Sequence, residues 1–69
     1  MITKIWQHIT TGERYAVALD SYGWVVGAAG PLHHSEIAQA KTGDWNSDPE
    51  VTADIRDAAG SYRDVTDRA

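Results

Sequence analysis

Three histidines are the side chains in this sequence with the chemistry to bind a metal ion or to move protons near neutral pH. They are His8 and the adjacent pair His33 and His34. Neighbouring residues on a helix point about 100° apart, which is a poor arrangement for chelating one ion. No acidic residue stands at the spacing of an HExxH motif, and the absence of cysteine removes thiolate sites. We predict no metal site and no cofactor.

Two further patterns share only their letters with functional motifs. The run His34-Ser35-Glu36 has the residue types of a catalytic triad, but triad side chains converge from separate segments. The glycines of GWVVGAAG, at 23, 27 and 30, match neither a dinucleotide fingerprint nor a phosphate loop. We expect Gly27 to make room for a neighbouring side chain or for the ring of Tyr15. We therefore predict no catalytic residue and a protein that is not an enzyme.

The length and net charge of the chain limit the number of domains and the kinds of partner that it can have. The chain has 69 residues, expected to form one domain over 1–69, with ten acidic and six basic residues and a formal charge of −4. No basic stripe that would grip nucleic acid is visible. No apolar run approaches the roughly 20 residues that span a bilayer, and MITKIWQHITTGERY lacks the apolar region of a signal peptide. We expect no nucleic-acid partner, no membrane partner and a cytoplasmic location.

Apolar periodicity predicts the elements that would position these residues. Alternation or β-prone composition predicts strands over 2–9, 14–20 and 24–29, separated by turns at 10–12 and 21–23. A short helix over 33–42 would end at Gly43. Asp48 and Pro49 would begin a second helix, which Gly60 interrupts, leaving 60–69 as a tail that can fray. The predicted fold is α+β, a three-stranded antiparallel meander followed by two helices, in the order β-β-β-α-α.

The sheet is apolar on both faces, which is unusual for so short a chain. If both turns are three-residue loops, Trp6 and Trp24 lie on one alanine-rich face together with Val26, which is then opposite Ala18. A chain of this size buries only about 60% of its extended surface. Two short helices could cover both faces, but each cover would be thin, and an uncovered apolar patch would mark an interaction site.

The second helix offers another surface. An apolar stripe recurs at spacings of three and four along it, formed by Val51, Ile55, Ala58, Tyr62 and Val65. Acidic residues flank the stripe on one side and arginines on the other, so two copies could pair in an isologous dimer. The alternative is that the stripe packs on the chain's own sheet.

These patterns predict a small acidic protein-binding module, an inhibitor, adaptor or regulator, whose partner is another protein or its own copy in a homodimer. The candidate interface residues are Trp6, Trp24, Val26, Val51, Ile55 and Tyr62. One alternative is a ligand-binding, metal-binding or catalytic site at a dimer seam, built from His8, His33, His34 and a tryptophan. Another is nucleic-acid mimicry, which needs one exposed acidic row formed by Glu50, Asp54, Asp57 and Asp64.

Overall fold

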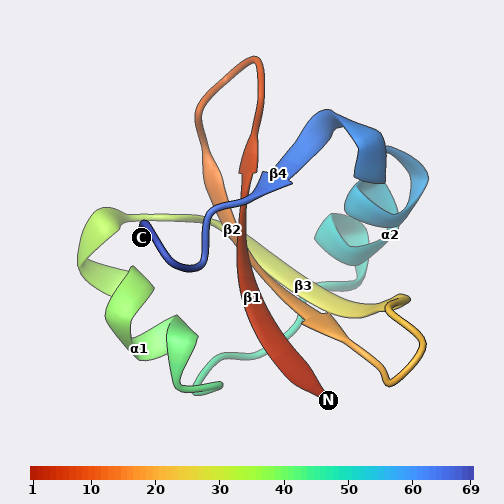
Figure 1. Cartoon of the computed structure of the whole chain (residues 1–69), viewed down its shortest axis with the longest axis horizontal. Helices are drawn as coiled ribbons and strands as arrows, with labels where there is room; N and C mark the ends of the chain where they lie inside the picture. Colours follow the sequence, from red (N-terminus) through yellow and green to blue (C-terminus); the bar gives the residue numbers. More distant parts are fainter.

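One antiparallel sheet carries a helix on each face (Figure 1). The computed structural model describes all residues, 1–69. The strands are β1 (Ile2–His8), β2 (Arg14–Leu19), β3 (Val25–Leu32) and β4 (Tyr62–Asp64), in the spatial order β3-β2-β1-β4. The helices are α1 (Ile37–Lys41), after a 3-10 turn over His34–Glu36, and α2 (Pro49–Asp57), before a 3-10 turn over Ala59–Ser61. The α+β class and the antiparallel meander are confirmed.

The predicted number of strands is wrong, because β4 completes the sheet. Tyr62–Asp64 pairs antiparallel with the end of β1, and the Ile9 amide donates to the Ser61 carbonyl oxygen at 2.9 Å. The chain order is therefore β-β-β-α-α-β. The helical spacing of the apolar stripe hid this strand: α2 ends at Asp57, and Tyr62 continues the spacing from within β4.

The His8 amide donates to the Glu13 carbonyl oxygen at 2.8 Å, so the pairing of β1 with β2 encloses four residues, Ile9 to Gly12, one more than the three-residue turn that the sequence predicts. His8 organises this loop. Its Nδ1 atom accepts from the amides of Thr10 and Thr11 at 3.1 and 3.3 Å, and its carbonyl oxygen accepts from the Gly12 amide at 2.9 Å. The positive φ of Gly12, 78°, then returns the chain into β2.

The extra loop residue reverses the faces of β1. Ile5 pairs with Ala16, and Trp6 pairs with Tyr15, one position away from the predicted register. Because successive strand residues alternate between faces, a one-residue shift exchanges them all. Trp6 therefore lies on the face of Tyr15 and Val17, and its predicted place on the alanine-rich face is wrong.

The turn between β2 and β3 forms as predicted, with Asp20 opposite Trp24. The Asp20 amide donates to the Trp24 carbonyl oxygen at 3.0 Å. The Asp20 carboxylate accepts from the amides of Tyr22 and Trp24 at 2.9 and 3.0 Å. After it, Val26 is the additional residue of a bulge, so Ala18 pairs with Gly27 and the predicted pairing of Ala18 with Val26 is wrong.

Each face of the sheet has its own small core. On one face, Ile37 and Ala40 of α1 pack against Ile5, Ala16 and Val65. On the other face, Ile55 of α2 packs against Val17, Val25 and Ala28. Only 12 of 69 residues are buried, so each cover is thin. No helix has the length and apolar character needed to cross a bilayer.

The helix starts and stops follow the predicted signals. The Asp48 carboxylate caps α2 by accepting from the Glu50 amide at 2.9 Å, and Pro49 is the first helical residue. The 3-10 turn and α1 together span 34–41, close to the predicted 33–42. Gly43 follows α1 with a φ of +87°.

Three residues spaced four apart, the N-cap Asp48 and Thr52 and Arg56 of α2, form hydrogen bonds to the outer edge of β3. The Asp48 amide donates to the Ala28 carbonyl oxygen at 2.8 Å, and the Ala28 amide donates to the Thr52 hydroxyl at 2.9 Å. The Arg56 guanidinium donates twice to the Val25 carbonyl oxygen, at 3.2 and 2.9 Å. Three backbone groups of this edge strand, the Ala28 amide and the carbonyl oxygens of Val25 and Ala28, are thereby satisfied by groups of the same molecule.

Removing the Thr52 hydroxyl should destabilise the fold. In Thr52→Val the buried Ala28 amide loses its acceptor, which costs about 1–3 kcal/mol. Thr42→Val is the matched control, because the exposed Thr42 hydroxyl donates to a carbonyl that water can reach. Urea unfolding measures both. Equal stabilities of the two variants would contradict this role of Thr52 at the edge of β3.

Gly30 is required by the packing of Tyr15. Its φ is +141°, and a Cβ at this position would lie 2.6 Å from the Tyr15 Cδ2 atom. Gly30→Ala should therefore cost about 1–3 kcal/mol in a urea unfolding experiment. Gly60→Ala is the control, because a Cβ on Gly60 would meet no heavy atom within 4 Å. It should change the free energy of unfolding by less than about 0.5 kcal/mol.

Candidate functional site

Exposed apolar side chains gather where β1 begins and β2 turns into β3. We call this group the sheet-end patch: Met1, Ile2, Tyr22, Trp24 and Val26. Tyr22 is 85% exposed and Trp24 is 70% exposed. The N-terminus and the β2–β3 turn lie at the same end of the molecule in Figure 1, and Ile2 pairs with Leu19 at the end of β2. This end of the sheet therefore presents a mostly uncovered apolar surface.

A hollow opens beside the sheet-end patch. Its volume is about 340 Å³, and Met1, Thr3, Ala18, Val26 and Trp45 are among its lining residues. It lies on the face that α1 covers, where α1, of five residues, is too short to reach the end of the sheet. We call it the sheet-end hollow. Val26 and Met1 thus belong both to the sheet-end patch and to the lining of the hollow.

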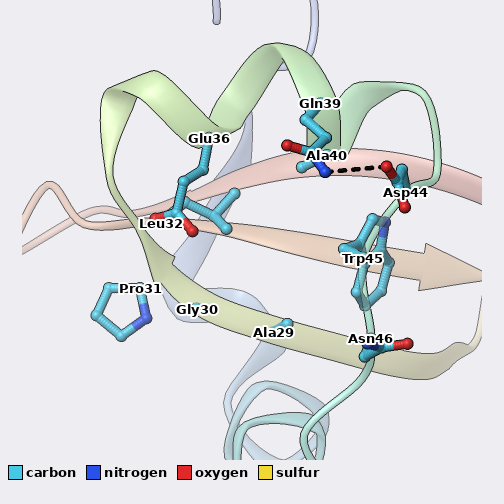
Figure 2. Close-up of a pocket in the computed structure, with 10 residues that line it drawn as sticks. All are labelled: Ala29, Gly30, Pro31, Leu32, Glu36, Gln39, Ala40, Asp44, Trp45 and Asn46. Atoms are coloured by element: carbon cyan, nitrogen blue, oxygen red, sulfur yellow. Dashed lines mark hydrogen bonds between the residues drawn. The ribbon is translucent and has the colours of Figure 1, made fainter.

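A second cavity, the Trp45 cleft, lies between α1 and β3 (Figure 2). Its volume is about 390 Å³. Glu36 and Gln39 line it from the α1 side, Pro31 from β3, and Asp44 and Trp45 from the loop after α1. The Gln39 Nε2 atom donates to the Asp44 Oδ2 atom at 2.9 Å, the dashed line in Figure 2. The half-buried Trp45 packs against the α1-side core and separates this cleft from the sheet-end hollow.

The loop that carries Trp45 crosses close above the sheet. A Cβ on Gly27 would lie 3.2 Å from the Ser47 Cβ atom, so the glycine makes room for a neighbouring side chain, as predicted. The other expectation for this glycine, room for Tyr15, belongs to Gly30. The Trp45 Nε1 atom points toward Thr3 of β1, 3.4 Å from its hydroxyl oxygen. These contacts hold the indole between the two cavities.

An aromatic cluster fills the opposite end of the α2 face. Tyr62 lies at its centre, with ring centroids 4.9 Å from His8, 5.6 Å from Tyr15 and 6.4 Å from Trp6. Burial, followed by the nearby carboxylates of Glu13 and Asp54, raises the pKa of both Tyr15 and Tyr62. A raised pKa keeps the phenols protonated, which is the opposite of what an activated base or nucleophile needs.

The six interface candidates predicted from the sequence therefore fall into two exposed residues and four that are covered or partly covered by the chain itself. Trp24 and Val26 are exposed, and Val26 also lines the sheet-end hollow. Trp6 and Tyr62 are half-buried in the aromatic cluster. Ile55 is fully buried and Val51 half-buried against the chain's own sheet, so the stripe of α2 is occupied.

His8 and His33 accept hydrogen bonds from backbone amides, and the rings of His33 and His34 lie with their centroids 4.6 Å apart. His8 caps the β1–β2 loop. The His33 side chain caps the turn before α1, and its Nδ1 atom lies 2.9 Å from the Ser35 hydroxyl. No group of three or more histidine, cysteine, aspartate or glutamate side chains lies in positions to hold a metal ion.

The acidic row does not continue along one element. Glu50, Asp54 and Asp57 lie exposed on α2. Asp64 lies on β4, where its carboxylate accepts from the Thr66 hydroxyl and amide and stands 3.9 Å from the Lys4 ammonium. These hydrogen bonds from Thr66 are the main reason that the pKa of Asp64 is lowered.

Sequence reasoning missed both cavities. The cavities form where residues of β1, β3 and the loop after α1 come together, and contacts between such distant segments cannot be predicted from the local spacing of residues. The one signal in the sequence is Trp45, a large apolar residue inside an otherwise polar loop. It packs against the core, as its type predicts, but its position between two cavities follows from no local pattern.

The chain was compared with protein-family models, curated proteins and solved structures. No protein-family model, curated protein or solved structure matches the chain. The functional argument therefore depends on the geometry of the sheet-end patch and the two cavities.

The tyrosine cluster predicts how stability changes in alkali. Unfolded tyrosines ionise near pH 10, whereas Tyr15 and Tyr62 hold their protons to higher pH in the folded state. The folded state then binds more protons, so the stability from this difference is complete below about pH 10 and falls as the pH rises further. Urea unfolding between about pH 8 and 11 should show this fall, and Tyr62→Phe should flatten it. A slope unchanged by Tyr62→Phe would contradict the assignment.

Proposed function

We propose that this protein is a small, non-enzymatic protein-binding module that associates with its own copy through the sheet-end patch and acts in the cytoplasm as an inhibitor, adaptor or regulator. The observation that carries the proposal is Trp24, 70% exposed at the base of a turn that hydrogen bonds hold rigid. Tryptophan is enriched among the residues that dominate interface energies. Because these bonds already fix the backbone that carries Trp24, the turn loses little backbone entropy on binding.

The area of the patch supports a protein partner. Two aromatic rings that are 85% and 70% exposed leave roughly 300 Å² uncovered, taking about 150–250 Å² for each aromatic side chain. The three aliphatic members of the patch add a comparable area. The total of roughly 600 Å² is distributed over both faces of the sheet end, with Ile2 on the face of Leu19 and Val26 in the hollow on the α1 face. It is about three quarters of the roughly 800 Å² that each partner contributes to a standard interface.

The shape of this end supports a second copy as the partner. Trp24 is 70% exposed two residues before Val26, which together with Met1 helps to line a hollow of about 340 Å³. A protruding ring and a hollow on one molecule can be matched reciprocally across a two-fold axis, Trp24 of each copy entering the hollow of the other.

The charges at this end agree with self-association. The Asp20 carboxylate is the acidic group of the β2–β3 turn, and it already accepts two backbone amides. The five side chains of the sheet-end patch carry no charge. Two copies with a net charge of −4 each can therefore approach through this end without placing carboxylates face to face.

Truncating Trp24 should disrupt the dimer. We expect Trp24→Ala to weaken self-association by roughly 30-fold or more, because a hot-spot side chain contributes at least about 2 kcal/mol. Sedimentation equilibrium over a hundredfold range of concentration measures the change. A wild-type protein that stays monomeric at the highest concentration would refute self-association.

The two ends of β1 give a matched control. Ile2 is 60% exposed within the sheet-end patch, and Ile9 is 57% exposed at the far end of the strand. Ile2→Ser should weaken the dimer several-fold, while Ile9→Ser should leave it unchanged. An equal effect of the two substitutions would place the contact elsewhere.

A further inference from the structure

We infer that the Trp45 cleft is a separate binding site for a cationic side chain, an arginine in an extended basic segment of a partner protein being the best match. This inference goes beyond the proposed dimer and does not depend on it. The cleft has three properties that fit such a side chain: its volume, an aromatic wall and carboxylates at both ends.

Its volume, about 390 Å³, lies in the range of ligand sites, about 300–1,000 Å³. Pro31 and Leu32 of β3 and Ala40 of α1 supply apolar wall. These surfaces can cover the methylene stem of an arginine or lysine, which such side chains bury while the charged head finds polar partners. The cleft is partly open to solvent, so a side chain can enter while its backbone stays outside.

The charges of the cleft are of one sign. Figure 2 shows Glu36 at one end, beside Leu32, and Asp44 at the other, beside Trp45. No lysine, arginine or histidine lines the cavity. The nearest cation on α1, Lys41, is not among the lining residues, and its ammonium donates to the backbone oxygen of Ala69. An anion would be repelled here, whereas a cation is attracted.

Both carboxylates retain capacity for a ligand. The Glu36 Oε1 atom accepts from the His33 amide at 2.8 Å, and the Asp44 Oδ2 atom accepts from the Gln39 side chain at 2.9 Å. These bonds hold each carboxylate in place by one oxygen, which leaves the second oxygen to accept from a guanidinium. Positioned acceptors of this kind suit the planar fork of arginine better than the point charge of lysine.

Trp45 supplies the third property. Its indole forms one wall of the cleft and is fixed from behind by packing on the core. A guanidinium stacks on an indole face through cation–π attraction, which is strongest for tryptophan among the aromatic residues. Since Glu36 and Asp44 are exposed, water and salt weaken their attraction, and a single arginine should bind in the millimolar range.

The test is a nuclear magnetic resonance titration of the ¹⁵N-labelled protein with acetyl-arginine-amide, with acetyl-citrulline-amide as the neutral analogue of the same shape. The arginine compound should shift the indole resonance of Trp45 and the side-chain amide of Gln39, and added salt should weaken its binding. The citrulline compound should bind at least several-fold more weakly. Equal binding of the two compounds, or shifts confined to residues outside the cleft, would overturn the inference.

Two conservative variants and one control test which carboxylates attract the arginine compound. Glu36→Gln and Asp44→Asn each keep an acceptor for the bond that the wild-type side chain makes, so the local fold is retained. Each should weaken binding of the arginine compound about two- to fivefold, and the double variant more strongly. Asp57→Asn removes the same charge from α2, on the other face of the sheet, and should have no effect. An effect of Asp57→Asn as large as that of Asp44→Asn would show that net charge alone attracts the ligand and would overturn the assignment to the cleft.

Discussion

The packing of α2 along β3 is the interaction on which the rest of the structure depends. Two rows of this nine-residue helix act at once. Val51 and Ile55 close the apolar face of the sheet, while Thr52 and Arg56 satisfy the outer edge of β3. A longer protein can divide these tasks among several elements. Here one short helix performs both, which leaves α1 and the loop after it to cover the other face incompletely.

That incomplete cover explains why the candidate surfaces lie where they do. The sheet-end hollow and the Trp45 cleft both open on the α1 side, one on each side of Trp45. The indole is the largest side chain on the loop that crosses this face, and it fills the middle of the face while leaving space at both ends. The hollow lined by Val26 and the cleft lined by Glu36 therefore have the same cause: too few residues cover this face of the sheet.

Much of the fold could be predicted from local patterns, because those patterns have local causes. Alternation predicted β2, β-prone composition predicted β1 and β3, Asp48 with Pro49 marked the start of α2, and Gly23 marked the second turn. The register of β1 could not be predicted, because a loop of three residues and one of four look alike in the sequence and place Trp6 on opposite faces. The strand β4 was hidden for a different reason. Tyr62 prolongs the helical spacing of α2, and only its pairing with His8, far away in the sequence, makes it a strand.

The candidate site was predictable to the same degree. Trp24 and Val26 are exposed, because they follow a well-marked turn and their neighbours are small. Ile55 and Tyr62 have equally apolar patterns, but their partners within the chain cover them. Whether an apolar residue is covered depends on contacts with distant segments. The local pattern could therefore identify these residues as candidates, but it could not distinguish the exposed ones from the covered ones.

The sealed edge of β3 also limits how copies of this protein can grow into larger assemblies. A strand from another molecule that approached β3 would meet a Val25 carbonyl and an Ala28 amide that α2 already occupies. At the other side of the sheet, β4 is only three residues long and offers little template. The proposed association through the end of the sheet, by contrast, would close on itself after two copies. A small protein with an exposed apolar patch would in this way remain a finite particle, while α2 obstructs the addition of a strand at the Val25 and Ala28 positions of β3.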